Sequence, residues 1–148
     1  MIVKTCNRYQ NNQIKNLIMD VLSEHGFEYD PEKDYDLEDI KQYYLNDGSV
    51  FYTGIVDGKI IGTGAVKRID NDRCEIKRIY IKKGFRNKGY GTKLFDETLE
   101  FAKKHYKTAT IKTDVALRKA VNLYLKKGFV ITHLDTENKI VYLRKYFH

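Results

Sequence analysis

Residues 74–91 read CEIKRIYIKKGFRNKGYG, and this stretch decides the fold. Its first half has the period of two of a half-buried strand, so we predict a strand over residues 73–81. After the glycines, apolar side chains recur at helical spacing, which predicts a helix over residues 89–105. We call the connection between them, residues 82–89, the glycine loop. The stretch therefore places a basic loop between a strand and the N-terminal end of a helix.

The glycine loop has the properties of a phosphate-binding site. The first N–H groups of a helix lack intrahelical partners and, with the positive end of the helix dipole, they attract anions. Gly89 and Gly91 have no Cβ atom, so a ligand can approach the backbone closely. Arg86 and Lys88 add positive charge in the densest basic stretch of the chain. We therefore expect a phosphate-bearing ligand here; the alternative is a plain strand-to-helix turn.

Three phosphate-binding patterns compete for this loop. The P-loop pattern G-x-x-x-x-G-K-[ST] matches at Gly84 and Gly89, but residues 90–91 are Tyr-Gly instead of Lys followed by Ser or Thr. The dinucleotide pattern G-x-G-x-x-G fails because Leu94 stands at its third glycine. The pattern (Arg/Gln)-x-x-Gly-x-(Gly/Ala) matches residues 86–91 at every defined position.

The flanking sequence predicts a chain that mixes helices and strands. Asp57-Gly58 between two runs with a period of two predicts a β-hairpin, because Asp-Gly supplies the positive φ of a type I′ turn. Asn11 or Asn12 can cap a first helix that ends at Gly26, and Asp36 can cap a second one. In chain order we predict a strand over 2–6, helices through 14–22 and over 37–45, strands over 49–56, 59–68 and 73–81, a helix over 89–105, a strand over 108–114, a helix over 117–127, and strands over 129–134 and 139–146.

This order predicts the fold class. An antiparallel meander followed by a parallel crossover indicates an α+β (mixed α/β) fold, with a mixed, mostly antiparallel sheet of about seven strands and helices on both faces. No linker or repeat divides the chain, so we expect a single domain over residues 1–148.

Composition restricts the compartment and the partners. No apolar run approaches the roughly 20 residues of a membrane span, and the N-terminus does not resemble a signal peptide, so we expect a cytoplasmic protein without membrane contact. Cys6 and Cys74 are not in metal-ligand spacing, and we expect no metal. The formal charge of +7 favours an anionic partner, but the charges are dispersed. Because no helix-turn-helix or RNP pattern is present, we do not expect nucleic acid.

At this point the chain resembles the GNAT superfamily of N-acetyltransferases. Residues 74–91 are similar to the central strand and pyrophosphate loop of that family, without a gap. Residues 120–129, AVNLYLKKGF, resemble its A-x-x-L-Y-x-K-x-G-F segment. The resemblance implies a three-layer fold and direct transfer of acetyl from acetyl-CoA to a primary amine in a ternary complex. One departure is Leu117, where many relatives carry an asparagine that binds the cofactor or a water.

The resemblance also implies roles for single residues. It makes Glu75 the general base, with a surface ion pair to a neighbouring Lys or Arg as the alternative, and Tyr124 the general acid for the CoA sulfur, with plain packing as the alternative. It sets Ile79 against the acetyl carbonyl and Ile81 against the pantetheine arm. The full set of cofactor-binding candidates is Ile79, Tyr80, Ile81, Arg86, Asn87, Lys88, Gly89, Tyr90, Gly91, Thr92 and Lys126.

In this family the first two helices and their connection usually wall the acceptor site, and here that region is aromatic and acidic. Tyr29, Tyr43 and Arg78 are the substrate-binding candidates; Arg78 could hold a substrate carboxylate or equally a salt-bridge partner. We expect a small amine or amino acid as acceptor, and the alternatives are a protein or peptide amine or a catalytically silent acyl-CoA-binding or sensing module. Exposed edge strands at the C-terminus favour a homodimer.

Overall fold

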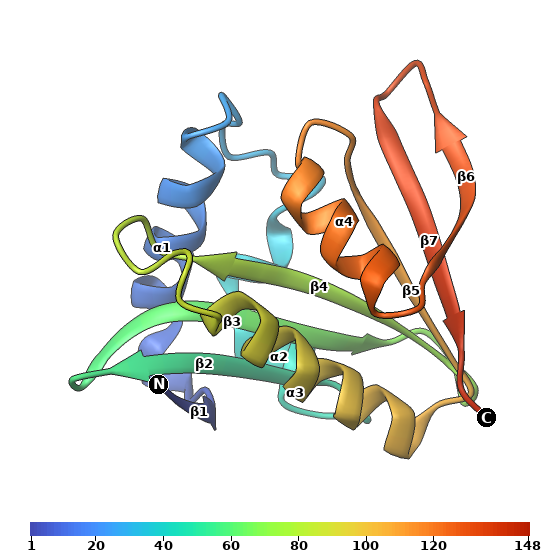
Figure 1. Ribbon diagram of the computed structural model, residues 1–148. Helices are drawn as coiled ribbons and strands as arrows, with labels where there is room; N and C mark the ends of the chain where they lie inside the picture. The colour runs from blue at the N-terminus through green and yellow to red at the C-terminus, as the bar shows by residue number, and fades with distance from the viewer.

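The computed structural model describes residues 1–148 and contains a seven-stranded sheet (Figure 1). The strands are β1 (Ile2–Thr5), β2 (Val50–Val56), β3 (Lys59–Arg68), β4 (Arg73–Ile81), β5 (Thr108–Asp114), β6 (Val130–Asp135) and β7 (Ile140–Tyr146). They lie in the order β1-β2-β3-β4-β5-β7-β6. All neighbours are antiparallel except β4 and β5, which are parallel. The predicted α+β class and the mixed, mostly antiparallel sheet of seven strands are confirmed.

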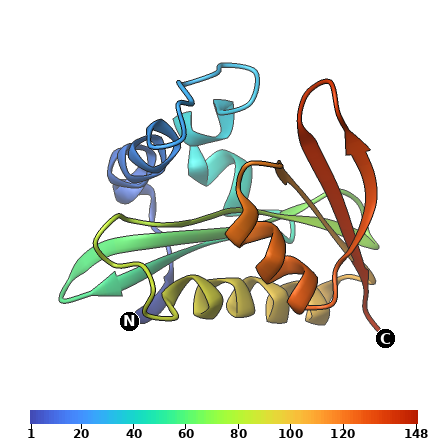
Figure 2. The same cartoon turned by 45° about the horizontal axis from the view of Figure 1, so that its top comes forward.

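Helices cover both faces of the sheet, which gives three layers (Figure 2). On one face, α1 (Asn11–Ser23) and α2 (Ile40–Tyr44) pack against a core that includes Phe51 and Ala65. On the other face, α3 (Tyr90–His105) and α4 (Arg118–Lys126) border a core that includes Val66 and Ile76. Val66 and Ala65 are consecutive, so the alternation of β3 divides its side chains between the two cores.

The long helices form because their apolar residues share one side. In α1, Ile14, Leu17, Ile18 and Val21 are buried, and this spacing places them on a single stripe. In α3 the buried stripe consists of Leu94, Phe95, Thr98 and Ala102. Lys103, Lys104 and His105 occupy the last turn of α3, where cations complement the dipole.

The start of α1 differs from the prediction. Asn7 caps a short 3-10 helix, η1 (Arg8–Gln10), that runs directly into α1, so Asn11 and Asn12 do not act as caps. The Asn11 side chain instead connects two segments: its Nδ2 donates to the Leu37 carbonyl at 2.8 Å and its Oδ1 accepts from the Ile40 N–H at 2.8 Å. Gly26 follows the end of α1 with a φ of +79°, as predicted.

The predicted second helix is two shorter pieces, the 3-10 helix η2 (Tyr35–Glu38) and then α2. The expected cap, Asp36, is buried, and its carboxylate binds Arg78 and Tyr44 instead of a helix N–H group. Asp39 caps α2 by accepting from the Gln42 N–H at 3.1 Å. The prediction was wrong because a distant guanidinium competes for the carboxylate, and local spacing gives no sign of that partner.

The hairpin of β2 and β3 follows the sequence prediction. Asp57 and Gly58 have φ values of +49° and +76°, which confirms the turn between β2 and β3. The outer strand β6 exposes Val130, Ile131 and Leu134 by 57%, 52% and 51%. The predicted homodimer stays a prediction. None of the helices has the length and hydropathy that crossing a bilayer requires.

Candidate functional site

The centre of the sheet opens between β4 and β5. Only Arg73, Cys74 and Glu75 pair with β5, opposite Thr108, Ala109 and Thr110. Beyond Glu75 the two strands diverge, and Figure 1 shows β4 running away from β5 and β7. The rest of β4 therefore has no strand partner on this side, and its backbone groups are available to a ligand.

A β-bulge lies on β4 beside this opening. In the register with β3, Thr63 is opposite Tyr80 and Ala65 is opposite Lys77, so Arg78 and Ile79 share one position. Arg78 has a φ of +62°, an uncommon conformation for a residue with a side chain. The Thr63 hydroxyl donates to the Arg78 carbonyl at 2.7 Å and supports this turn of the strand.

Two glycines of β3 allow Ile79 and Ile81 to lie close to α3. A Cβ atom on Gly64 would stand 2.9 Å from the Ile79 side chain, and one on Gly62 would stand 2.7 Å from the Ile81 and Leu94 side chains. No side chain would fit at these positions without displacing the core. Ile79 and Ile81 thus lie on the α3 face of β4, next to the opening.

Arg78 is held by buried acids from the N-terminal part of the chain. Its guanidinium donates to both Asp36 oxygens, at 2.6 and 3.1 Å, and to Asp34 at 3.1 Å. Tyr44 donates a short hydrogen bond to the same Asp36 carboxylate. Burial acts to raise the pKa of Asp36, but the hydrogen bond and the charge of Arg78 outweigh it, so the pKa is lowered. The structure thus pairs Arg78 inside the protein and ties η2 to the bulge.

The glycine loop presents unpaired backbone donors. The N–H groups of residues 86–89 donate to no backbone or side-chain acceptor. Asn87 and Gly89 have φ values of +62° and +81°, and Gly89 directly precedes the first residue of α3. Backbone N–H groups in left-handed turns and at a helix N-terminus form a concave site for anions. The residues present therefore fit a pyrophosphate.

The side chain of Arg86 points to another partner. Its terminal nitrogens donate to the two Glu24 oxygens at 2.6 and 2.7 Å, and its Nε donates to the Ile81 carbonyl at 2.9 Å. Glu24 follows the last residue of α1. The hydrogen bond to Arg86 lowers the pKa of Glu24, and the same bond raises the pKa of Arg86. The pair is therefore ionised on both sides at neutral pH.

Tyr124 lies on the α3 and α4 face of the sheet. It is 6% exposed and packs on Phe95 and Phe129, with ring centroids 5.1 and 6.4 Å apart. Burial raises the pKa of Tyr124, and the nearby Tyr80 of β4 contributes in the same direction. The phenol therefore keeps its proton across the physiological pH range.

Glu75 lies on the opposite face. It alternates with Cys74 and Ile76, which belong to the core under α3, so its side chain faces the α1 and α2 side. Glu75 is the last residue of β4 that pairs with β5. Glu75 and Tyr124 thus lie on the two faces of the sheet at either side of the opening.

The other substrate-binding candidates lie in the N-terminal part of the chain, Tyr43 in α2 and Tyr29 between α1 and η2. The Tyr43 ring packs edge-on against Tyr35 with centroids 5.2 Å apart, and its carbonyl accepts from Lys67. The Tyr29 ring lies under the Lys15 ammonium, 4.9 Å from it. A hydrogen bond to Glu38 raises the pKa of Tyr29. Both tyrosines are therefore fixed by neighbours from other elements.

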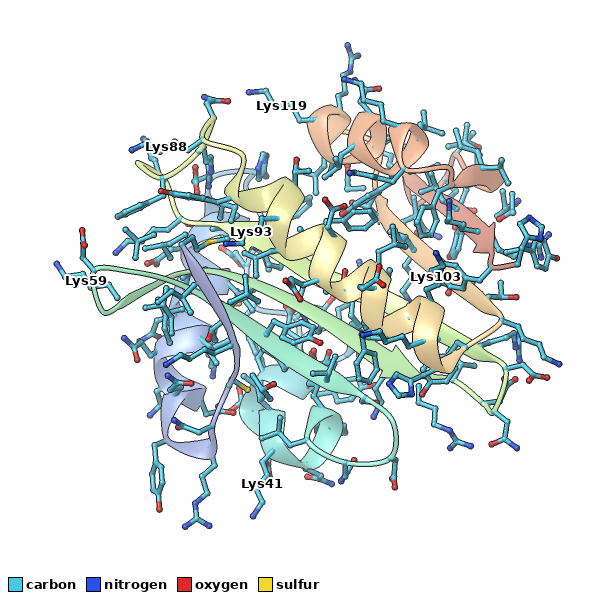
Figure 3. The ribbon with its side chains drawn as sticks, turned by 60° about the horizontal axis from the view of Figure 1, so that its bottom comes forward. Lys41, Lys59, Lys88, Lys93, Lys103 and Lys119 are labelled. Carbon is cyan, nitrogen blue, oxygen red and sulfur yellow. The ribbon has the colours of Figure 1, made fainter.

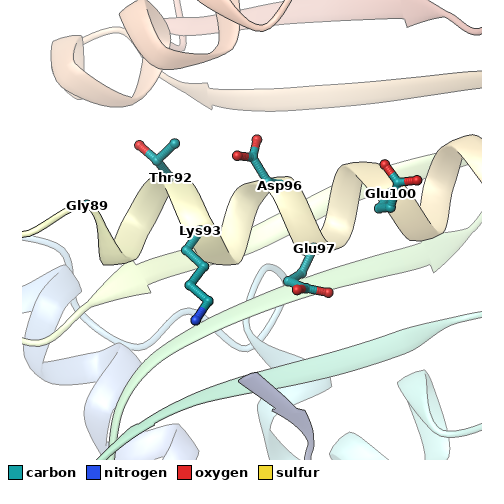
Figure 4. A pocket seen from close by; sticks show the side chains of 6 residues that line it. All are labelled: Gly89, Thr92, Lys93, Asp96, Glu97 and Glu100. Carbon is teal, nitrogen blue, oxygen red and sulfur yellow. The ribbon is translucent and has the colours of Figure 1, made fainter. Parts of the chain in front are cut away.

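A shallow depression follows the outer side of α3 from Gly89 past Asp96 to Glu100 (Figure 4). Thr92, Asp96 and Glu100 line one side of it, and Lys93 and Glu97 line the other. Its acidic lining opposes a phosphate-bearing ligand. Only its Gly89 and Thr92 end overlaps with the predicted cofactor residues.

The remaining cofactor candidates lie at the N-terminal end of α3 and at the C-terminal end of α4. Tyr90, Gly91 and Thr92 form the first turn of α3, and Lys126 is the exposed last residue of α4. Figure 3 shows that the labelled lysines, including Lys88 at the glycine loop, are spread over different elements and sides of the molecule. The positive charge is therefore dispersed, as the sequence predicts. No group of His, Cys, Asp and Glu side chains is arranged to hold a metal ion.

Sequence reasoning missed three features of this site. It did not find Glu24 as the partner of Arg86, nor Asp36 and Asp34 as partners of Arg78. It also missed the bulge, although the glycines at 62 and 64 in β3 signal a close approach to the neighbouring strand and helix. The long-range ion pairs had no signal in the local sequence.

Comparisons with known proteins agree with this geometry. A model of the acetyltransferase (GNAT) family matches residues 13–129. N-acetylaspartate synthetase of Xenopus tropicalis is 33% identical over 97 residues, which are 64% of this chain and 36% of that protein. The chain thus spans only about a third of the length of that relative.

Solved structures share the fold. The crystal structure of an acetyltransferase of the GNAT family from Staphylococcus aureus Mu50 has a TM-score of 0.89 at 23% identity, and the match covers 99% of both chains. The PaiA N-acetyltransferase of Thermoplasma acidophilum, crystallised in complex with coenzyme A, has a TM-score of 0.78 at 19% identity and covers 99% of this chain and 98% of that one.

Proposed function

Because this chain belongs to the acetyltransferase (GNAT) family, we propose that it transfers an acetyl group from acetyl-CoA to a primary amine by direct attack in a ternary complex. The observation that carries the proposal is the set of unpaired N–H groups at residues 86–89, directly before α3 and beside the opening of the sheet. Such donors suit the pyrophosphate of CoA. We propose residues 86–92, with Ile79, Tyr80, Ile81 and Lys126, as the cofactor-binding residues.

The chain's own groups meet the chemical needs of acyl transfer. Bound acetyl-CoA supplies an activated acetyl thioester. Backbone N–H groups beside the bulge at Arg78 and Ile79 stabilise the carbonyl oxygen as it gains negative charge. The Glu75 carboxylate takes a proton from the acceptor ammonium, directly or through water, and the Tyr124 hydroxyl returns a proton to the departing sulfur. These two groups face opposite sides of the sheet, so donor and acceptor enter from different directions.

For the acceptor we propose a small amine, with amino acids as the first candidates. One relative is named N-acetylaspartate synthetase, which supports a carboxylate-bearing acceptor. The register also supports it: Glu75, Thr110 and Arg144 lie in one row across β4, β5 and β7. Arg144 Nε is a buried donor without a partner, and a carboxylate could satisfy it. Arg78 is the weaker candidate for this task because its carboxylate partners are internal.

The test compares the parent protein with Tyr124→Phe, using thiol release with a panel of amines that includes acidic amino acids. Phenylalanine preserves the packing on Phe95 and Phe129, so we expect a normal fold, an unchanged KM for acetyl-CoA and a kcat about 100-fold lower. Tyr9→Phe, at an exposed position on η1, is the control and should keep full turnover.

Unchanged turnover in Tyr124→Phe would remove this residue from the mechanism. A parent protein that binds CoA but releases no thiol with any amine would favour the sensing module. A parent protein that does not bind CoA at all would contradict the proposed function.

A further inference from the structure

The Arg86 side chain uses most of its N–H donors within the protein. Three of its donors are used, two by Glu24 and one by the Ile81 carbonyl. A bidentate pair fixes the plane of the guanidinium as well as its position. The side chain therefore joins the end of β4, the glycine loop and the C-terminal end of α1.

The glycine loop has few other restraints. Among residues 83–89, only the Phe85 N–H donates a backbone hydrogen bond, to the Lys82 carbonyl at 3.1 Å. Gly84, Asn87 and Gly89 all have positive φ values, and a left-handed Asn costs free energy unless its surroundings hold it. The Lys82 N–H donates to the Ile61 carbonyl at 2.8 Å and the Gly89 carbonyl accepts from the Lys93 N–H at 3.1 Å, so the two ends of the loop are held by the backbone. The contacts of Arg86 tie its middle to the rest of the protein.

We propose that Glu24 is a positioning residue for the donor site. This inference rests on the proposed function, because it concerns the same CoA-binding loop. Glu24 holds Arg86, and Arg86 holds the loop in the conformation in which the N–H groups of residues 86–89 converge. In this protein the arginine of the Arg-x-x-Gly-x-Gly pattern serves CoA by fixing the backbone, and the backbone rather than the guanidinium binds the pyrophosphate.

The proposal and simple electrostatics predict opposite changes in CoA affinity when the charge of Glu24 is removed, which makes the proposal testable. Removing an acid close to an anion-binding loop increases the local positive charge and should tighten CoA binding. Loss of a positioning contact should weaken it. We therefore measure CoA binding by isothermal titration calorimetry for the parent, Glu24→Gln, Arg86→Glu and the double variant Glu24→Arg with Arg86→Glu.

We expect Glu24→Gln to weaken CoA binding about fivefold and to raise the KM for acetyl-CoA similarly, with kcat and the acceptor KM unchanged. Arg86→Glu should weaken binding further. The double variant rebuilds the ion pair with exchanged partners but not the hydrogen bond to the Ile81 carbonyl, because a carboxylate has no N–H to donate, so it should recover part of the binding lost by Arg86→Glu. Glu28→Gln is the matched control, since Glu28 is exposed and forms no ion pair.

Tighter CoA binding by Glu24→Gln, or a double variant that binds CoA no better than Arg86→Glu alone, would overturn the proposal. Thermal unfolding of each variant confirms that it is folded. A parent protein that fails to bind CoA contradicts the proposed function instead, so the two failures are distinguishable.

Discussion

Arg78 and Arg86 stand at the two ends of the proposed active site and use the same chemistry in different surroundings. Each arginine forms a bidentate pair with an acid from the first forty residues, Asp36 for Arg78 and Glu24 for Arg86. The side chain of Arg78 is 7% exposed, whereas that of Arg86 is 37% exposed. The first pair lies beside the bulge, where we propose that the acceptor binds, and the second lies in the glycine loop, where we propose that the donor binds.

The difference in burial assigns different tasks to the two pairs. Breaking a buried pair leaves a charge without water or partner, which typically costs about 3–5 kcal/mol. Exposed pairs contribute about 0–1 kcal/mol because water and salt screen them. The Arg78 network should therefore determine whether η2 folds against the bulge of β4. The Arg86 pair should determine how tightly the folded protein binds acetyl-CoA. Variants at each pair test this difference in burial.

Asp36→Asn should have the largest effect. It removes the charge that balances Arg78 and weakens the contact with Tyr44, so we expect the free energy of unfolding in urea to fall by about 3 kcal/mol. Asp70→Asn breaks an exposed pair with Arg73 and is the matched control, with a much smaller loss. A loss for Asp36→Asn no larger than for the control would mean that burial does not distinguish the two arginines.

Acid titration should show a smaller effect of the same network. The pKa of Asp36 is lowered in the folded protein, so its contribution to stability is present above its unfolded pKa of about 4 and is lost as the pH falls below that value. The difference in unfolding free energy between the parent and Asp36→Asn should stay constant above about pH 5 and narrow below about pH 4. A difference that stays constant down to pH 3 would show that folding does not lower the pKa of Asp36.

The smallest effect on stability should come from the exposed pair. Glu24→Ala should lower the free energy of unfolding by less than about 1 kcal/mol, and added salt should reduce even that loss. Urea unfolding at low and high ionic strength measures both. A loss of unfolding free energy as large as that of Asp36→Asn would mean that the exposed and the buried pair contribute equally to stability, which would contradict the difference drawn between them.

The same contrast explains what could be predicted from sequence. The strand, glycine loop and helix over residues 73–105 follow from local periodicity and turn chemistry, and the structure has them within a residue or two. The Asp57-Gly58 hairpin follows from the same rules. The error at Asp36 has a different origin. Its residue type and its position before an apolar run are typical of a helix cap, but its carboxylate binds Arg78, which is 42 positions away in the chain.

The candidate site divides in the same way. The backbone of the glycine loop could be predicted, because glycine spacing and a position between a strand and a helix are local properties; anion binding by this loop stays a prediction. The partners of Arg78 and Arg86 could not be predicted, because the sequence shows where charges are but not which distant charges meet. The expected roles of Glu75 and Tyr124 came from family resemblance, and kinetics of the variants will test them.

The short pairing between β4 and β5 has a consequence for the mechanics of the whole molecule. Only three residues of β4 pair with β5. The seven strands therefore form two groups, β1 to β4 and β5 to β7, which are joined only by this short pairing. Helix α3 contacts strands of both groups, so it bridges the short pairing between them. The helix that begins at the glycine loop thus runs toward this pairing, and a ligand at its first turn is bound at the end of α3 that lies farther from the junction between the two groups of strands (Figure 1).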